Sequence, residues 1–369
     1  MNYKNRIKAL RKELRENKLD GIIIDNPVNR RYFSGFTGSF GALFIDSRNA
    51  YISTDSRYFI QVKRQCPDFT LLPVGKTSVY ENFMQKKKLE GKRIGFEADF
   101  LSITSLKTVK KILMGVKLVG TNRIPIQIRS IKTDDEIKEI IAAQKITDDC
   151  FTWLINTLKP GMTEIDIAWK MEVFMREKGA SAISFDVIMA SGPNSALPHA
   201  VPTNRKIKKG EPLLFDFGCT VNGYNSDMTR VFFLGKPPKK MELIYKRVLE
   251  THLMVFELSQ PGTNVADIDE ITRDYIYRTK WNGENLMGEA KGQGRYEHGL
   301  GHGVGLEVHE LPVLSIKLPK DVLKPGHIVT NEPGIYIEGE GGVRIEDMMH
   351  ITESGPVSLT KSPKEMIIL

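Results

Sequence analysis

The sequence has only 3 cysteines among its 369 residues, and it lacks a long apolar run. Cys66, Cys150 and Cys219 lie far apart and form no CxxC pair, so we expect a reducing compartment, the cytoplasm. No run of about 18 apolar residues is present, so we expect no membrane partner. Charged side chains recur along residues 1–8 and leave no apolar core for a secretory signal peptide.

Histidine is also scarce, and charge is unevenly distributed. All 7 histidines follow residue 198. Residues 1–125 hold 24 Lys and Arg against 11 Asp and Glu, and the remainder holds 29 against 34. The net charge of +8 therefore describes a basic first third and a mildly acidic remainder. The lysine clusters at 86–88 and 110–111 fit solvated helix faces, so a basic nucleic-acid-binding module is the weaker alternative and we expect no nucleic-acid partner.

The first third shows the alternation of a small α/β domain. Ile7, Leu10 and Leu14 lie on one face of an amphipathic helix, and residues 21–25 predict a buried strand. Further strands are expected at 42–46, 50–53, 69–73 and 93–97, and helices near 56–65, 78–88 and 102–113.

The length predicts a second domain. Thr133 and Glu136 form a capping-box pattern that predicts a helix to about residue 158, and Thr163 with Asp166 predicts a second helix to about residue 178. The rest is rich in strands and turns. We therefore expect domains at 1–130 and 131–369, with two further helices in the second domain at 238–258 and 264–280.

Residues 213–231 predict a hairpin that brings two carboxylates together. Asn222-Gly223 is a strong two-residue turn signal, and it places Asp216 opposite Thr229. Asp216 and Asp227 then become diagonal neighbours on one face, about 7–8 Å apart at the backbone. Leu and Phe neighbours predict burial of Asp216, and two buried carboxylates need a cation. The alternative is an edge hairpin with two solvated aspartates.

Residues 298–310 hold three histidines among glycines. Histidine is a common metal ligand and general acid–base, and glycine lets the backbone approach a ligand closely. The alternative is a glycine-rich surface loop with incidental histidines. The segment does not fit the dinucleotide fingerprint, and the chain has no P-loop, HExxH or GxSxG motif, so we expect no nucleotide cofactor.

Two later segments add carboxylates. Glu332 follows a strand that Pro333-Gly334 ends. In residues 342–348, strand alternation places Arg344, Glu346 and Met348 on one face. A solvated surface pair is the alternative for Arg344 and Glu346.

Taken in order, these segments resemble the pita-bread-fold metallopeptidases, and more narrowly the Xaa-Pro aminopeptidase (aminopeptidase P) and Xaa-Pro dipeptidase (prolidase) family. The segment from Phe185-Asp186 to Pro198-His199 shares this likeness. Residues 31–39 and 54–58 resemble the creatinase-type amino-terminal domain. The resemblance implies an α/β creatinase-like N-terminal domain and an α+β pita-bread catalytic domain with a curved, mainly antiparallel sheet.

The resemblance also assigns roles to particular residues. It implies five metal ligands for two divalent ions, namely Asp216, Asp227, His302, Glu332 and Glu346. It adds three accessory histidines and an arginine as further catalytic residues, namely His199, His298, His309 and Arg344. Four carboxylates with one imidazole suit Mn²⁺ best, with Co²⁺ or Zn²⁺ as alternatives.

From this ligand set we derive a hypothesis for the reaction. A hydroxide bridging the two metals attacks the carbonyl before proline, and Glu332 passes the proton to the leaving nitrogen. His199 and His309 stabilise the oxyanion or position the substrate, and His298 lines the proline ring. Ordinary core packing is the alternative for the three histidines.

The expected activity is an Xaa-Pro aminopeptidase that acts on proline-containing peptides. The alternative is a prolidase restricted to dipeptides, since both use the same ligands. Methionine aminopeptidase shares the ligands but generally lacks the preceding α/β domain. The resemblance further implies a homodimer or higher homo-oligomer.

Overall fold

The computed structural model describes residues 2–121, 123–288, 292–296, 298–317 and 321–369. The chain divides into two compact units, Met1–Arg129 and Ser130–Leu369, and each is described by itself. The three cysteines are free thiols with buried side chains. The cytoplasmic location and the homodimer stay predictions.

The first unit is an α/β domain built on one mixed sheet. Its strands are β1 (Gly21–Ile24), β2 (Ala42–Asp46), β3 (Ala50–Thr54), β4 (Thr70–Pro73), β5 (Arg93–Glu97) and β6 (Lys117–Thr121). Its helices are α1 (Tyr3–Glu16), α2 (Pro27–Ser34), η1 (Ser56–Tyr58), α3 (Phe59–Gln65), α4 (Val79–Lys87), α5 (Ile103–Ile112) and α6 (Ile124–Ser130). In the sheet order β4-β3-β2-β1-β5-β6, the pairs β1–β5, β5–β6 and β3–β4 are parallel.

The predicted strands and helices of this unit are confirmed, and three elements were missed. Helix α2 carries a clear start signal, because Asn26 accepts from the backbone N–H of Val28 and Asn29 and Pro27 occupies the first turn. Strand β6 lies at the edge of the sheet, and most of its residues are at least partly exposed. It therefore lacks the apolar pattern from which a strand is predicted. Helix α6 was the third element missed.

A buried polar cluster lies where β1 and β5 end. The Glu97 carboxylate accepts from the backbone N–H of Asp25 and Asn26, each at 2.7 Å, and from Asn29 Nδ2 at 2.6 Å. Tyr80 donates its hydroxyl to Asp25 Oδ1 at 3.0 Å. Burial raises the pKa of Asp25 from 3.8 to about 6. The cluster therefore makes the stability of the protein depend on pH.

We expect Asp25→Asn to flatten part of that pH dependence. The folded protein holds a proton on Asp25 between pH 3.8 and about 6, where the unfolded chain has released it. The stabilisation from this proton is present at low pH and is lost as pH rises through about 6. It totals about 3 kcal/mol, about half of it between pH 5 and pH 8.

Urea unfolding of the full-length wild type and the Asp25→Asn variant at pH 5 and pH 8 measures this effect. The wild type should lose more stability than the variant on going to pH 8. An equal loss in both proteins would show that Asp25 titrates normally.

The second unit is rich in short strands. Its helices are α7 (Asp134–Thr157), α8 (Glu164–Glu177), η2 (Gly192–Ala196), α9 (Lys239–Leu258) and α10 (Val265–Tyr277). Its strands are β7 (Ala182–Ile183), β8 (Ile188–Ser191), β9 (Pro212–Phe217), β10 (Cys219–Val221), β11 (Tyr224–Asn225), β12 (Met228–Phe233), β13 (Lys280–Trp281), β14 (Glu284–Asn285), β15 (Gly294–Arg295), β16 (Gly301–Gly303), β17 (Glu310–Leu314), β18 (Ile328–Asn331), β19 (Gly334–Ile337), β20 (Gly341–Arg344), β21 (Asp347–Thr352), β22 (Gly355–Ser358) and β23 (Ile367–Ile368).

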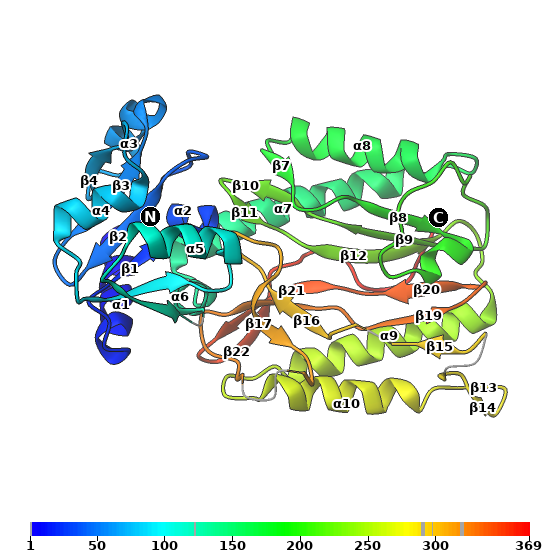
Figure 1. The fold of residues 1–369 in the computed structure, drawn as a ribbon. Coiled ribbons are helices and arrows are strands. Elements are labelled where there is room, and N and C mark those ends of the chain that lie inside the picture. The colour runs from blue at the N-terminus through cyan, green and yellow to red at the C-terminus, as the bar shows by residue number, and fades with distance from the viewer. Residues whose placement is uncertain (1, 122, 289–291, 297, 318–320) are drawn as a thin grey trace. The chain divides into compact units, whose positions relative to one another are not determined.

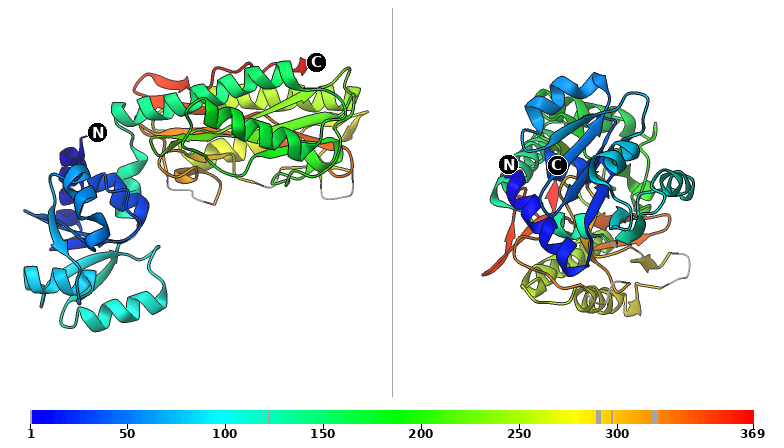
Figure 2. Two further views of the ribbon diagram at one scale, coloured as in Figure 1. Left: turned by 90° about the horizontal axis from the view of Figure 1, so that it is seen from above. Right: turned by 60° about the vertical axis from the view of Figure 1, so that its left-hand side comes forward.

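Helices cover both faces of the strands in this unit. Helices α7 and α8 lie on one side and α9 and α10 on the other (Figure 1 and Figure 2). One core packs Phe151 and Met171 of α7 and α8 against Phe215 of β9, and a second packs Val248 of α9 against Val343 of β20. Burying each such side chain contributes about 1.5–3 kcal/mol. Among the described strand pairs of this unit only β12–β23 is parallel, so the expected mainly antiparallel α+β architecture is confirmed.

The predicted hairpin register is also confirmed. Asp216 pairs with Thr229, and Asn222 and Gly223 form the turn with φ of 48° and 83°. The ladder is interrupted at Gly218, where an added Cβ would lie 1.9 Å from the Ser226 carbonyl oxygen. This interruption separates β9–β12, which join the sheet with β8, from β10–β11, which join β7.

Candidate metal centre and active site

A cavity of about 570 Å³ in the second unit gathers the predicted site residues. It is lined by all nine of them, namely His199, Asp216, Asp227, His298, His302, His309, Glu332, Arg344 and Glu346. The solvated-surface alternatives for the aspartates and for Arg344 and Glu346 are wrong, because these four residues are buried.

The five proposed ligands sit within or beside short strands. Asp216 lies in β9 and Asp227 immediately precedes β12. His302 is the middle residue of β16, and Glu332 follows β18. Glu346 lies between β20 and β21, which belong to different sheets. Because strands end or change sheets beside these residues, their side chains can line one cavity.

Three of the ligands already approach one another closely. Asp227, His302 and Glu346 can each offer one ligand atom, and these atoms lie within 4.8 Å of one another. His302 Nε2 lies 3.6 Å from Asp227 Oδ2 and 3.4 Å from Glu332 Oε1. Its Nδ1 lies 3.2 Å from the Gly303 carbonyl oxygen, which can only accept. The Nε2 lone pair of the neutral ring therefore points into the cluster, as metal ligation requires.

The crowded negative charge of this cluster favours the binding of cations. Burial raises the pKa of the Asp227, Glu332 and Glu346 carboxyls, and a neighbouring carboxylate raises each further. Asp216 Oδ1 is buried and has no hydrogen-bond partner among the described residues. Burial lowers the pKa of His302, so its imidazole is neutral. Four crowded carboxylates and a neutral imidazole fit divalent ions that prefer oxygen.

Arg344 forms hydrogen bonds with several members of the cluster and with their neighbours. Its Nη2 donates to Asp216 Oδ2 at 2.6 Å and its Nη1 to the Tyr336 hydroxyl at 2.7 Å. Its Nε donates to Thr229 Oγ1 at 3.0 Å, and Thr229 in turn donates to Glu346 Oε2 at 2.6 Å. Arg344 therefore balances part of the negative charge and orients two of the proposed ligands.

Sequence reasoning missed three side chains that support the site. Thr229 bridges Arg344 and Glu346, and the hairpin register had already placed it opposite Asp216. Thr330 donates to Glu332 Oε1 at 3.3 Å and accepts from the His302 backbone N–H at 3.0 Å. Tyr336 has no sequence signal, because its hydroxyl joins Arg344 of the neighbouring strand β20 to His298, which lies 38 residues earlier.

His298 is fully engaged within the protein. Its Nδ1 lies 2.7 Å from the Gly299 carbonyl oxygen, so it carries the proton, and its Nε2 accepts from the Tyr336 hydroxyl at 2.9 Å. Burial lowers the pKa of His298, which keeps the ring neutral. The ring also packs edge-on against Tyr296 and Tyr336. This geometry suits a wall of the cavity better than a hydrogen bond to a substrate.

The other two accessory histidines are exposed and face the same cavity. The His309 ring contacts the His302 ring edge-on, with centroids 4.3 Å apart. Partial desolvation of the ring inside the cavity, followed by the neighbouring His302, lowers the pKa of His309. His199 lies on the segment between η2 and β9. Both can offer ring N–H groups to a bound molecule, so core packing does not explain them.

One detail of the sequence interpretation is wrong. Met348 does not share the face of Arg344 and Glu346. It packs in a separate core cluster with Val304 and Ile328. The strand breaks after Arg344 and a new strand begins at Asp347, so simple alternation does not continue through the segment.

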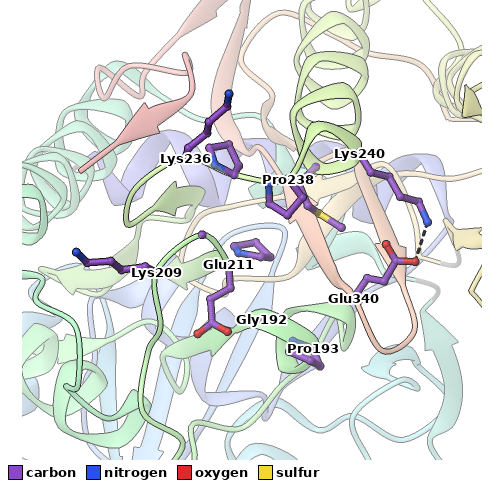
Figure 3. Close-up of a pocket in the computed structure, with 12 residues that line it drawn as sticks. Gly192, Pro193, Lys209, Glu211, Lys236, Pro238, Lys240 and Glu340 are labelled. Carbon is purple, nitrogen blue, oxygen red and sulfur yellow. Dashed lines mark hydrogen bonds and ion pairs between the residues drawn. The ribbon is translucent and has the colours of Figure 1, made fainter.

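A second cavity, of about 620 Å³, contains none of the predicted site residues (Figure 3). Lys209, Lys236 and Lys240 surround a floor that includes Pro238. Lys240 pairs with Glu340 at 2.7 Å. Its lining lacks the histidine and carboxylate cluster of the first cavity, which remains the candidate active site.

The fold is a pita-bread scaffold, and its carboxylate–histidine cavity is a candidate site for metal-dependent hydrolysis. The chain matches "Metallopeptidase family M24" over residues 138–353 and the "Creatinase/Prolidase N-terminal domain" over residues 6–131. It therefore belongs to metallopeptidase family M24, whose members are hydrolases that use divalent metal ions. No helix within the described residues has the length and apolar character to span a membrane.

Relatives cover the whole chain. The solved Xaa-Pro dipeptidase from Bacillus anthracis is 38% identical, with a TM-score of 0.91 and 100% of both chains covered. The X-Pro aminopeptidase from Thermotoga maritima is 32% identical, with a TM-score of 0.85, covering 97% of this chain and 100% of the other. The Xaa-Pro dipeptidase of Pyrococcus furiosus is 35% identical over 374 residues, 99% of this chain and 100% of that protein.

Proposed function

We propose that the protein is a metal-dependent aminopeptidase that hydrolyses the Xaa-Pro bond at the N-terminus of peptides longer than two residues. The names of its relatives support cleavage of the Xaa-Pro bond. The charge of the cavity supports a substrate longer than a dipeptide. Among the described residues that line the cavity, Arg344 alone carries a guanidinium or ammonium group. Its three donor nitrogens already bond Asp216, Tyr336 and Thr229.

This charge pattern disfavours a dipeptide. In an Xaa-Pro dipeptide the carboxylate of proline itself would enter the cavity, next to four protein carboxylates. Two divalent ions held by those four carboxylates would be balanced by them, so the added carboxylate would still be a buried anion without a cation partner of its own. Arg344 is already bonded, and His309, whose pKa is lowered, is neutral and offers no charge. In a longer peptide an uncharged amide occupies that place.

We propose that Asp216, Asp227, His302, Glu332 and Glu346 hold two divalent ions, most favourably Mn²⁺ because the set is rich in oxygen. Ions bound there would supply Lewis-acid chemistry, polarising the scissile carbonyl and lowering the pKa of the attacking water. The X-Pro bond has no N–H, so a peptidase that binds it through the amide hydrogen fails. Recognition through the carbonyl avoids that requirement.

The chain's own residues supply the remaining functions. Glu332, held by Thr330, is placed to accept a proton and deliver it to the leaving prolyl nitrogen. His309 and His199 offer ring N–H groups to the developing oxyanion. His298, locked by Tyr336, forms the wall for the proline ring.

The second candidate is a prolidase restricted to dipeptides. The names of the relatives from Bacillus anthracis and Pyrococcus furiosus favour it. The two activities differ in how they treat the carboxylate of proline, so substrates that differ only in that group separate them.

We expect Ala-Pro-Ala to be cleaved with a kcat/KM at least about 10-fold above that of Ala-Pro, since an unpaired buried charge costs about 1.4 kcal/mol or more. Ala-Pro amide, which lacks only the charge, should be cleaved about as well as the tripeptide. Each peptide is assayed with Mn²⁺ and with chelator. Cleavage of Ala-Pro alone would establish the prolidase, and no metal-dependent cleavage of any peptide would contradict both functions.

A further inference from the structure

One carboxylate in the wall of the candidate active site is not among the proposed metal ligands. Asp186 lines the same cavity as Asp216, Asp227, Glu332 and Glu346. Its side chain is exposed, whereas Asp216, Asp227 and Glu346 are buried. Among the residues that the structure describes, the Asp186 carboxylate has no hydrogen-bond or ion-pair partner. It is therefore open to a cation that enters the cavity.

The strand that follows Asp186 sets its distance from the ligands. Ile188, the first residue of β8, pairs with Asp216 of β9. Directly opposed residues have Cβ atoms about 4.5–5.5 Å apart, and two residues of chain span at most about 7 Å. Val187 packs into the core with Phe215, while Asp186 and Ile188 line the cavity. Asp186 therefore lies on the cavity side of this segment, close to the ligands but nearer to solvent.

Apolar side chains accompany Asp186 in the cavity wall. Phe185 and Ile188, which flank it in the sequence, are partly buried and line the cavity, as does the exposed Val201. Arg344 is 3% exposed and bonded to other groups, so it does not neutralise this carboxylate. Lysine and arginine bury their apolar stems along such surfaces and keep the charged head near water. The wall therefore suits a long cationic side chain.

The proposed reaction determines which part of a substrate comes near Asp186. The scissile carbonyl belongs to the first residue of the peptide, so this carbonyl must lie at the proposed ligands. The α-ammonium is bonded to the carbon next to that carbonyl, and it therefore lies beside the four ligand carboxylates. A lysine or arginine side chain instead carries its charge away on a long stem. Such a stem leads toward the exposed side of the cavity, where Asp186 lies.

We propose that Asp186 is a specificity-determining residue, whose carboxylate binds the cationic side chain of the first substrate residue and favours peptides that begin with Lys or Arg before proline. This substrate class rests on the proposed function. Ion pairs at exposed sites are weak, so the expected effect is a preference rather than an absolute requirement. The exposed position also makes the preference sensitive to salt.

We expect the wild type to cleave Lys-Pro-Ala with a kcat/KM about 5-fold above that of norleucine-Pro-Ala, which has the same stem without the charge. In Asp186→Asn this ratio should fall to about 1, because the carboxylate charge is lost. In Asp186→Lys, the ratio of kcat/KM for Glu-Pro-Ala to that for Lys-Pro-Ala should rise at least about 10-fold over wild type. Raising NaCl from about 0.05 M to about 0.5 M should reduce the wild-type preference.

Glu177→Gln is the matched control for the loss of an exposed charge. Glu177 is the last residue of α8, and it is exposed and outside the cavity lining. This variant should keep the wild-type ratio for the two peptides.

Binding of the same two peptides to chelator-treated protein, measured by calorimetry, gives a readout that needs no hydrolysis. The ratio of Kd for norleucine-Pro-Ala to Kd for Lys-Pro-Ala should fall by about 3-fold or more from wild type to Asp186→Asn. If no peptide were cleaved with metal, the proposed function would be contradicted, and this binding ratio would decide the role of Asp186 by itself.

Two results would overturn the role of Asp186 and leave the proposed function intact. If Asp186→Asn lowered cleavage of both peptides equally, Asp186 would bind the α-ammonium that both carry. A ratio that is the same in wild type and Asp186→Asn, with no loss of cleavage, would show that this carboxylate does not contact the substrate. An Asp186→Lys enzyme that prefers Lys-Pro-Ala as strongly as the wild type would contradict the proposal as well.

Discussion

Asp227→Asn is expected to reduce metal-dependent hydrolysis by more than about 100-fold, to background. Asp227 is 3% exposed, and it offers a ligand atom within 4.8 Å of those of His302 and Glu346. An amide has nearly the same shape but carries no charge. Replacing even the outer partners of a metal ligand costs 10–100-fold, so loss of a ligand charge must cost more. Hydrolysis of Ala-Pro-Ala with saturating Mn²⁺ measures the effect.

The same variant should change stability in opposite directions with and without metal. In the metal-free protein, Asp227 is crowded by Glu346, Asp216 and Glu332, so a neutral amide should raise the melting temperature by a few degrees. With Mn²⁺ the wild type should gain stability through binding, about 2.7 kcal/mol at a concentration 100 times Kd. The variant should gain much less.

Glu353→Gln is the control for this charge removal. Glu353 is exposed in the turn between β21 and β22, a few residues after Glu346. It should leave both activity and the Mn²⁺-dependent rise in melting temperature unchanged. An Asp227→Asn enzyme with substantial Mn²⁺-dependent activity would show that the ligand set is wrong.

Arg344→Met is expected to destabilise the metal-free protein by about 3–5 kcal/mol, the usual cost of removing one partner from a buried charge network. Arg344 is 3% exposed, and its side chain bonds Asp216, Thr229 and Tyr336. Its loss leaves the buried carboxylates without their nearest cation. Bound Mn²⁺ supplies positive charge at the same place, so the destabilisation should shrink when metal is present. Urea unfolding with Mn²⁺ and with chelator measures both values.

Two further variants sharpen this prediction. Arg344→Lys keeps the charge but lacks the planar group that reaches three acceptors, so it should fall between wild type and Arg344→Met. Arg278→Met breaks an exposed ion pair with Asp274 and should cost no more than about 1 kcal/mol. If Arg344→Met were equally destabilising with and without Mn²⁺, Arg344 would act by packing rather than by balancing the ligands' charge.

Local features of the sequence predicted local features of the structure accurately. The Asn222-Gly223 turn predicted the pairing of Asp216 with Thr229, because a two-residue turn sets the register of both strands. The capping pattern at Thr133 predicted the start of α7, where the Thr133 backbone N–H donates to Glu136 at 3.1 Å. Such signals depend on residues within about ten positions of one another, so they can be read without knowing the fold.

The same reasoning failed where a strand was interrupted or a partner was distant. Alternation placed Met348 beside Glu346, but the chain changes sheets between Arg344 and Asp347. The partnership of Arg344 with Asp216 spans 128 residues, and that of Tyr336 with His298 spans 38.

By itself, the sequence determined most elements of the first unit, the four long helices of the second, the hairpin register and, through a family resemblance, which nine side chains meet in the cavity. Only the tertiary structure decided their relations: that Arg344 bonds Asp216, and that His298 has both nitrogens occupied. Element signals depend on neighbouring residues and regular repeats. Side-chain partnerships in a buried site depend on how separate sheets pack, and that packing is a property of the whole chain.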